Sequence, residues 1–414
     1  MSLPFRLPQG LFFPYNPQRN MDYKSLFTQV QKTISDLSVP GEGVAAITTM
    51  AETIADNFRD QLGITGARLY AYRNDDYELI HRIGRKRNDD LGIMVSENYG
   101  PIRSLLQNGV IVMDRKDPEV DAQLEKQLGA RRFAAIIVGD DDYILSFDVS
   151  PESSREDILF SLNIIRSSIN QRLRVDRYVS ILEEAKHIQQ TILPSRPPKF
   201  DGFDIFGRTI PAEQVSGDYY DFIPFSKASL GIALADATGH GLPAALMVRD
   251  VHMGLRMGTD RDFKIVRTVQ KLNEIIHRSR LTTKFVSLFY GELESSGAFI
   301  YTNAGHTPTL HFHGNRTDEL KHGGAVLGPT PDAIYTRGYV HMEKGDILCM
   351  YSDGIVEARN LSDEEFGLDR LKRLVRRGRD ESAESICNTV LERVARWGSV
   401  DPDDQTIVIV KRDK

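Results

Sequence analysis

The stretch that decides the fold is Leu230-Gly231-Ile232-Ala233-Leu234-Ala235 followed by Asp236-Ala237-Thr238-Gly239-His240-Gly241. A short apolar run that ends in a glycine-containing turn is typical of a buried strand. The turn therefore places the carboxylate of Asp236 where a sheet gives way to a loop. Asp353 has the same setting, because it follows the apolar residues 347–351 and precedes Gly354.

Acidic residues occupy four such positions in the second half of the chain. The clusters are Ser216-Gly217-Asp218-Tyr219-Tyr220-Asp221-Phe222, the turn at Asp236, Ser352-Asp353-Gly354 and Asp403-Asp404-Gln405-Thr406. Carboxylates that converge repel one another unless cations neutralise them. Mg²⁺ and Mn²⁺ prefer oxygen ligands, and a pair of such ions can activate a shared water and hold a phosphate oxygen. One Asp before a glycine turn is more often only a turn residue, but the set of four predicts a site for hard divalent metals.

The sequence around these clusters is rich in strand patterns. Strands are predicted at 203–209, 219–224, 230–235, 285–293, 299–303, 309–312, 338–342, 346–351 and 405–410, with helices at 242–257, 263–278, 368–376 and 382–397. Many strands with paired helices indicate two antiparallel sheets covered by helices.

Five motifs in sequential order resemble a known family. They are the three clusters at 216–222, 352–354 and 403–406, the turn at 236–241, and Asn303-Ala304-Gly305-His306. Together they look like the RsbU/SpoIIE-like branch of the metal-dependent (PPM) serine/threonine protein phosphatases. The upstream residues 185–194 also resemble that family's entry segment. The resemblance implies an α/β-β/α sandwich with a binuclear Mn²⁺/Mg²⁺ centre, which hydrolyses phosphoserine or phosphothreonine with a metal-activated water and no phosphoenzyme.

The resemblance also implies roles for single residues. Asp236 would bridge both metals, the carbonyl of Ala237 would bind one of them, and Asp353 and Asp403 would complete the second site, which makes Asp236 and Asp353 the catalytic candidates. Asp218 aligns with the family's early acidic ligand, directly or through water. Asp221 is a further ligand candidate, with bracing of the site or its loop as the alternative.

Other polar residues near the motifs are interpreted as structural. In related phosphatases the histidine of a shorter Asp-Gly-His-Gly motif is assigned as general acid, but His240 lies two residues further from its aspartate, which favours a structural or capping role over a catalytic one. His306 is expected to fix a loop rather than to act in catalysis. Residues 212–220 contain no arginine, so the metals are expected to do most of the phosphate binding. Cys349 and Ser352 are not expected to act as nucleophiles.

The first half of the chain is predicted to be an α+β sensor domain over residues 22–174, preceded by a flexible tail at 1–21. Helices are expected at 23–37 and 44–62, strands at 67–72, 77–83, 109–113, 133–138 and 143–148, and a closing helix from about residue 155. The order of elements resembles a GAF-type sensor. No motif names its ligand, so a small molecule, a protein partner and dimerisation remain open.

A helical linker is predicted over residues 175–195. A coiled-coil seam with three-and-four spacing, which ends at a proline, is formed by Val175, Tyr178, Leu182, Ala185, Ile188 or Gln189, and Ile192. We favour a parallel two-chain linker, hence a homodimer, in which the sensor controls the phosphatase. The alternative is one amphipathic helix that packs on its own domain. The phosphatase domain is then expected at 196–414.

The net charge and the distribution of apolar residues limit which partners the protein is expected to have. The chain has 414 residues and a net charge of −6, which argues against a nucleic-acid binder and disfavours a metal-dependent nuclease. No stretch approaches the roughly 20 apolar residues of a spanning helix, and the first residues do not read as a signal peptide, so we expect a cytoplasmic protein without a membrane span.

The sequence thus predicts a Mn²⁺- or Mg²⁺-dependent protein serine/threonine phosphatase that is regulated by its first domain. In the family that it resembles, the substrate is often a STAS-type anti-sigma factor antagonist in a partner-switching pathway. The alternative is a catalytically silent signalling scaffold with the same fold, which would not need all four acids.

Overall fold

The computed structural model describes residues 23–35, 43–84, 91–239, 241–257, 265–279, 285–398 and 402–413. The chain divides into two compact units, Met1–Val179 and Ser180–Lys414, and each is described by itself. The expected tail at 1–21 lies outside the described residues, as does His240.

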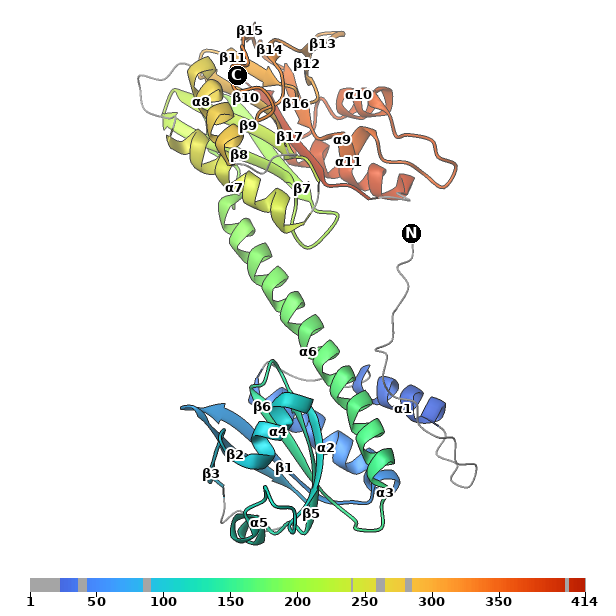
Figure 1. Cartoon of the computed structure of the whole chain (residues 1–414). Helices are drawn as coiled ribbons and strands as arrows, with labels where there is room; N and C mark the ends of the chain where they lie inside the picture. Colours follow the sequence, from blue (N-terminus) through green and yellow to red (C-terminus); the bar gives the residue numbers. More distant parts are fainter. Residues whose placement is uncertain are drawn as a thin grey trace. The chain divides into compact units, whose positions relative to one another are not determined.

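The first unit is built on one antiparallel sheet of six strands in the order β3-β2-β1-β6-β5-β4. Its elements are α1 (Tyr23–Ser35), α2 (Val44–Asn57), α3 (Arg59–Leu62), β1 (Ile64–Arg73), β2 (Asp76–Ile83), β3 (Met94–Ser96), α4 (Gly100–Asn108), β4 (Val110–Asp114), α5 (Ala122–Leu128), β5 (Arg132–Val138) and β6 (Tyr143–Val149), and α6 (Arg155–Ile192) begins there. Figure 1 shows the sheet with helices packed around it. The expected strands and helices are present, whereas β3, α4 and α5 were missed because each is short.

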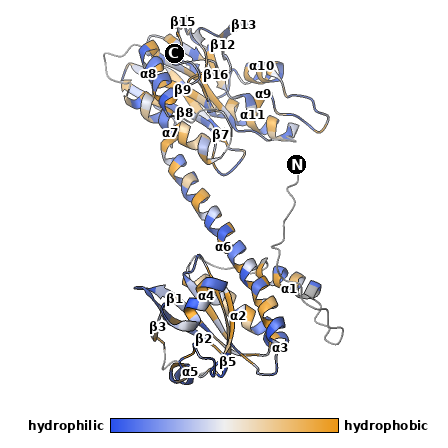
Figure 2. Cartoon of the chain, viewed as in Figure 1, coloured by the Kyte–Doolittle hydropathy of each residue, from blue (hydrophilic) through white to orange (hydrophobic). Residues whose placement is uncertain are grey.

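Helices cover both faces of this sheet, and the side chains of β5 point alternately into the two cores that result. Ala134, Ile136 and Val138 join the core that contains residues of α1, α2 and α6. Phe133 and Ala135 point the other way, into the core that contains residues of α4 and α5. Successive side chains of a strand face opposite sides of the sheet, so a strand covered on both sides is apolar throughout. This continuous apolar run appears along β5 in the hydropathy colouring (Figure 2).

The second unit contains two sheets. One has the order β14-β11-β10-β9-β8 with β15 paired to β11, and the other has the order β13-β12-β16-β17-β7. The strands are β7 (Phe203–Ile210), β8 (Asp218–Ser226), β9 (Ser229–Ala237), β10 (Val286–Glu294), β11 (Ala298–Ala304), β12 (Thr309–His313), β13 (Arg316–Leu320), β14 (Gly323–Gly324), β15 (Gly338–His341), β16 (Ile347–Tyr351) and β17 (Gln405–Arg412). The helices that follow Ile192 are α7 (Leu242–Met257), α8 (Ile265–Arg278), α9 (Asp353–Val356), α10 (Leu368–Arg377) and α11 (Ala383–Trp397).

Three cores hold the second unit in four layers. One lies between α7 and α8 and the first sheet, one lies between the two sheets, and one lies between the second sheet and α10 and α11. Figure 1 shows the two helical layers on the outer faces of the two sheets. The α/β-β/α sandwich predicted from the sequence is confirmed.

Helix α6 is one continuous helix of 38 residues, and the boundary between the two units falls inside it. Several of its apolar side chains are exposed on this chain, including Val175, Tyr178, Val179 and Ile188. The two-chain linker stays a prediction. Among the helices that the structure describes, none combines the length and apolar character needed to cross a bilayer.

Candidate metal centre

Asp218 and Asp236 lie opposite each other on neighbouring strands. Asp218 begins β8, Asp236 is the penultimate residue of β9, and the antiparallel register pairs the two directly. Side chains of directly paired residues point to the same face of a sheet, so the two carboxylates are neighbours. Gly217 is required beside them, because a Cβ there would stand 2.8 Å from the carbonyl oxygen of Ala237. The first two acidic clusters therefore meet at one end of the first sheet.

Asp353 and Asp403 meet at one end of the second sheet. Asp353 begins α9 just after β16, and Asp403 lies just before β17. These strands pair in antiparallel fashion, and the amide of Ser352 donates to the carbonyl of Thr406 over 2.9 Å. A Cβ on Gly354 would stand 2.2 Å from the carbonyl oxygen of Asp404, so only glycine lets the two turns approach this closely.

The charges of these carboxylates act on one another across the two sheets. Burial raises the pKa of Asp236 to about 7, and the charges of Asp353, Asp403 and Asp404 add to this effect. Burial and the charge of Asp403 raise the pKa of Asp353. Burial raises the pKa of Asp218 well above its ordinary value, with the charge of Asp236 next. The largest charge effects on the pKa values of these three aspartates, as far as the structure describes the chain, come from other carboxylates and not from lysine or arginine.

The donor set suits hard divalent ions. Asp218 is buried, and its Oδ2 atom has no hydrogen-bond partner among the described residues. The described residues contain no group of three or more His, Cys, Asp or Glu side chains that would by itself hold an ion. Mg²⁺ typically takes only one or two carboxylates and keeps several waters, so paired carboxylates with unsatisfied oxygens fit it. The acids brought together from two sheets are a plausible donor set for such ions.

Asp404, to which the sequence analysis gave no role, fixes the approach to Asp218. Its carboxylate accepts hydrogen bonds from the backbone amides of Ala212 at 2.7 Å and Gly217 at 2.6 Å. The hydroxyl of Ser352 donates to the carbonyl of Asp404 and accepts from the amide of Thr406. These contacts join the last two acidic clusters to the first.

Gln189, an alternative position of the predicted linker seam, lies near the end of α6 and contacts the backbone at Ser216. Its Nε2 donates to the carbonyl of Ser216 over 2.5 Å, and the amide of Ser216 donates to its Oε1 over 2.9 Å. The hydroxyl of Ser216 in turn accepts from the amide of Asp218 over 3.0 Å. The end of α6 is thus bonded to the backbone that leads into Asp218. A glutamine in a helix matches a surface pattern, so only the fold shows that it is buried.

Asp221 is surrounded by groups that neutralise it. Arg256 of α7 donates to both carboxylate oxygens at 2.9 to 3.1 Å, and the hydroxyl of Tyr219 donates to Oδ2 over 2.9 Å. His252 of α7 lies 3.6 Å from the same oxygen. These contacts tie α7 to β8 and favour the bracing role over that of a metal ligand.

His306 is buried beside the strand that faces Asp236. Its Nδ1 lies 2.6 Å from the hydroxyl of Ser287, which is the residue paired with Asp236 in the β9–β10 register. Asn303 holds the backbone of His306 by accepting from its amide and donating to its carbonyl. Burial lowers the pKa of His306 to about 4, so the ring is neutral near pH 7. These contacts agree with the expected loop-fixing role.

Comparison with known proteins gives the family. A family model described as Stage II sporulation protein E (SpoIIE) matches residues 226–413. Phosphoserine phosphatase RsbU of Bacillus subtilis is 30% identical over 239 residues, which is 56% of this chain and 70% of that relative. Protein IcfG of Synechocystis sp. is 26% identical over 318 residues, covering 67% of this chain and 50% of that relative's length.

A solved structure has the same architecture. The SiaA-PP2C domain of Pseudomonas aeruginosa aligns with a TM-score of 0.52 and 18% identity, over 58% of this chain and 99% of that domain. The likeness concerns the fold alone. The sequence relatives carry the assignment further: the chain belongs to the SpoIIE/RsbU family of PP2C-type, metal-dependent protein serine/threonine phosphatases.

Proposed function

We propose that this phosphatase uses a binuclear Mn²⁺ or Mg²⁺ centre to hydrolyse phosphoserine on a signalling protein. The observation that carries the proposal is the convergence of Asp218, Asp236, Asp353 and Asp403 from two sheets, where the charges of these acids raise one another's pKa values. Asp236, whose charge interacts with Asp218, Asp353 and Asp403, would be a ligand shared by the ions, and the carbonyl of Ala237 would bind one of them. Asp353 and Asp403 would hold the second ion, and Asp218 would bind the first directly or through water.

When bound, the pair of ions supplies an activated water and neutralises the phosphate charge. The protein's own part is to hold the carboxylates in place. Asp404 and Ser352 fix the turns, and Asp221 braces β8 against α7 through Arg256. Preorganised ligands of this kind lower the cost of forming the charged transition state.

We further propose that the substrate is a small STAS-type anti-sigma factor antagonist that carries phosphoserine. Support comes from the similarity to phosphoserine phosphatase RsbU over most of that relative's length. Such a folded substrate would be preferred over a phosphopeptide of the same sequence, because it brings additional contacts outside the phosphate site. A kcat/KM that is equal for the two substrates would contradict this part of the proposal.

We also propose that the first unit acts as a sensor whose state is transmitted along α6, in a homodimer joined by that helix. The support is that α6 runs without interruption from the first unit to Gln189, which bonds the backbone next to Asp218. Analytical ultracentrifugation of the full chain tests the dimer, and a monomer at micromolar concentration would remove that part.

The central test is hydrolysis of p-nitrophenyl phosphate and of a phosphoserine protein by the full chain with Mn²⁺. We expect Asp236→Asn and Asp353→Asn to lower kcat/KM by roughly 10³-fold, because each removes a ligand that stabilises the transition state. Asp332→Asn, an exposed aspartate of the same unit, is the control and should leave activity unchanged. Calorimetric Mn²⁺ titration gives a second readout. A wild-type protein without Mn²⁺-dependent turnover would favour the silent scaffold instead.

A further inference from the structure

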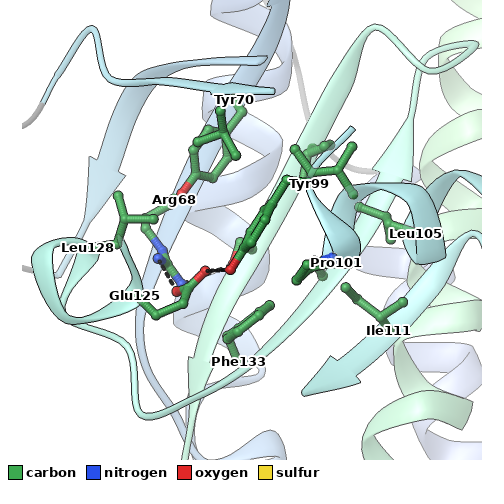
Figure 3. A pocket seen from close by; sticks show the side chains of 14 residues that line it. Arg68, Tyr70, Tyr99, Pro101, Leu105, Ile111, Glu125, Leu128 and Phe133 are labelled. Atoms are coloured by element: carbon green, nitrogen blue, oxygen red, sulfur yellow. Dashed lines mark hydrogen bonds and ion pairs between the residues drawn. The ribbon is translucent and has the colours of Figure 1, made fainter. Parts of the chain in front are cut away.

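The first unit contains a cavity between one face of its sheet and the helices α4 and α5. About 400 Å³ around the cavity is free of atoms when its open mouth is included, and the cavity itself has a volume of about 40 Å³. That is room for roughly three waters before any side chain moves. The wall is mostly apolar, and Figure 3 shows Tyr99, Pro101, Leu105, Ile111 and Phe133 around it.

One wall of the cavity carries a buried arginine. Arg68 of β1 is 1% exposed, and its Nη2 donates to Ser146 at 3.1 Å and to Asp148 at 3.0 Å. Its Nε atom is buried and has no hydrogen-bond partner among the described residues. A buried N–H without an acceptor is unfavourable, so a ligand oxygen at this atom would be bound favourably.

The charged groups around Arg68 favour a ligand without a net charge. Asp148 of β6 already forms a close ion pair with the guanidinium group. Glu125 of α5 lies 3.5 Å from Nη1, a loose contact, and burial raises the pKa of this carboxyl. An anionic ligand would leave an unbalanced negative charge in a buried place, which is strongly unfavourable. A neutral ligand adds no charge.

The polar groups on the other side of the cavity favour a hydroxyl. The phenolic hydroxyl of Tyr99 donates to Glu125 over 3.3 Å and accepts from the amide of Asp121 over 3.1 Å. Figure 3 shows the ring of Tyr99 beside the apolar wall, with its oxygen at Glu125. Tyr99 is the residue before α4 and is only half buried, so it can turn away without disrupting a strand. A ligand hydroxyl could then donate to Glu125 in place of the Tyr99 hydroxyl.

We propose that this cavity is a sensor site for a small neutral ring molecule with a hydroxyl group, of the phenol type. The hydroxyl accepts from Nε of Arg68 and donates to Glu125, while the ring packs against Leu105, Ile111 and Phe133. Tyr99 swings out to admit it. The site belongs to the first unit and is independent of the metal centre, so it stands or fails apart from the proposed hydrolysis.

The test uses three probes with the same fluorinated ring and different polar groups. They are 4-fluorophenol, fluorobenzene and 4-fluorobenzoate, observed by ¹⁹F NMR line broadening with the full-length protein. We expect 4-fluorophenol to bind with a Kd on the order of 0.1 to 1 mM, because roughly this affinity is typical of a ligand with about eight non-hydrogen atoms. Fluorobenzene should bind at least about tenfold more weakly, and 4-fluorobenzoate should not bind.

Two substitutions on α4 locate the site. Leu105 is buried and lines the cavity, whereas Leu106 is exposed on the same helix. Leu105→Phe should fill the space and weaken 4-fluorophenol binding at least about tenfold. Leu106→Phe is the matched control and should bind as the wild type does. Circular dichroism checks that both variants are folded.

A third variant, Tyr99→Phe, tests the position of the ligand hydroxyl even if Leu105→Phe fails to fold. Tyr99→Phe keeps the ring and removes the hydroxyl that competes for Glu125, so 4-fluorophenol should bind several-fold more tightly. Binding that is unchanged or weaker in Tyr99→Phe would overturn the proposed position of the ligand. Equal binding of fluorobenzene, or binding of 4-fluorobenzoate alone, would overturn the assignment of a neutral hydroxyl. No broadening with any probe would overturn the site.

Discussion

The two units bury acidic side chains in opposite ways. In the first unit Asp148 and Glu125 surround a buried arginine, so the positive charge is part of the chain. In the second unit the pKa values of Asp218, Asp236 and Asp353 are raised by burial and by the charges of neighbouring carboxylates. Buried charges must be balanced, and the chain either supplies the counter-charge or leaves the site to be filled by ions. The first arrangement is balanced within the chain, whereas the second is the site that we propose to be filled by ions.

The largest effect on stability is expected when the acid that pairs with Arg68 is removed. Asp148→Asn should lower the free energy of unfolding of the first unit by about 3 kcal/mol or more, because it leaves a buried positive charge without its close partner. Hydrogen exchange along β6 in the full chain measures the loss. Asp140→Asn removes one side of an exposed ion pair with Arg177 and is the control, with an expected change below about 0.5 kcal/mol. Equal effects of the two variants would show that Arg68 does not depend on Asp148.

A buried titratable group can also avoid the cost of an unbalanced charge by staying neutral. The buried ring of His306 is an example. Its pKa is lowered to about 4, whereas an unfolded histidine titrates near 6.5. The stabilising contribution is therefore complete above about pH 6.5 and is lost as the pH falls from there toward 4. Two and a half pKa units correspond to about 3 kcal/mol.

The measurement is denaturant unfolding at pH 7.5 and pH 5 for wild type, His306→Gln and His341→Gln. The difference between the two pH values should be smaller in His306→Gln by about 2 kcal/mol, because only part of the titration lies in this range. His341 is exposed, so His341→Gln should behave as the wild type. An identical pH dependence in all three proteins would contradict a neutral buried His306.

The contact between α6 and the acidic site can be tested by substitution of Gln189. Gln189→Leu removes both hydrogen bonds to Ser216, which precedes Asp218 by two residues. We expect roughly a tenfold lower kcat/KM and a higher Mn²⁺ concentration for half-maximal activity, because ligand positions depend on their supporting contacts. Gln190→Leu makes the same change at an exposed neighbour and should have little effect. If both variants keep full activity, α6 does not position the site.

The smallest expected effect is on stability, when the repulsion between the carboxylates of the second unit is reduced. In ion-free protein, Asp236→Asn should raise the free energy of unfolding of the second unit by about 1 kcal/mol, since it removes one of several like charges. Added Mn²⁺ should then stabilise the wild type and have much less effect on the variant. Thermal unfolding with and without Mn²⁺ gives both values. A variant less stable than the wild type without ions would mean that the site is not electrostatically strained.

Much of the architecture was predictable from local patterns. Long strands such as β9 and helices such as α11 have clear apolar periodicity, and the ordered motifs identified the sandwich. The short elements α4, α5 and β13 were missed because a few residues carry too little periodicity. Those two short helices form a wall of the cavity beside Arg68, so the candidate ligand site could not be predicted.

The family, the two-sheet architecture and the candidate acidic ligands could be read from the order of motifs and the residue types alone, because these depend on local sequence. The tertiary structure decided which acids face one another, since strand register alone sets Asp218 opposite Asp236. It also decided that Asp221 is bound by Arg256, that Gln189 reaches the backbone at Ser216, and that Arg68 is buried. These contacts join residues far apart in the chain, and only folding brings them within hydrogen-bonding distance.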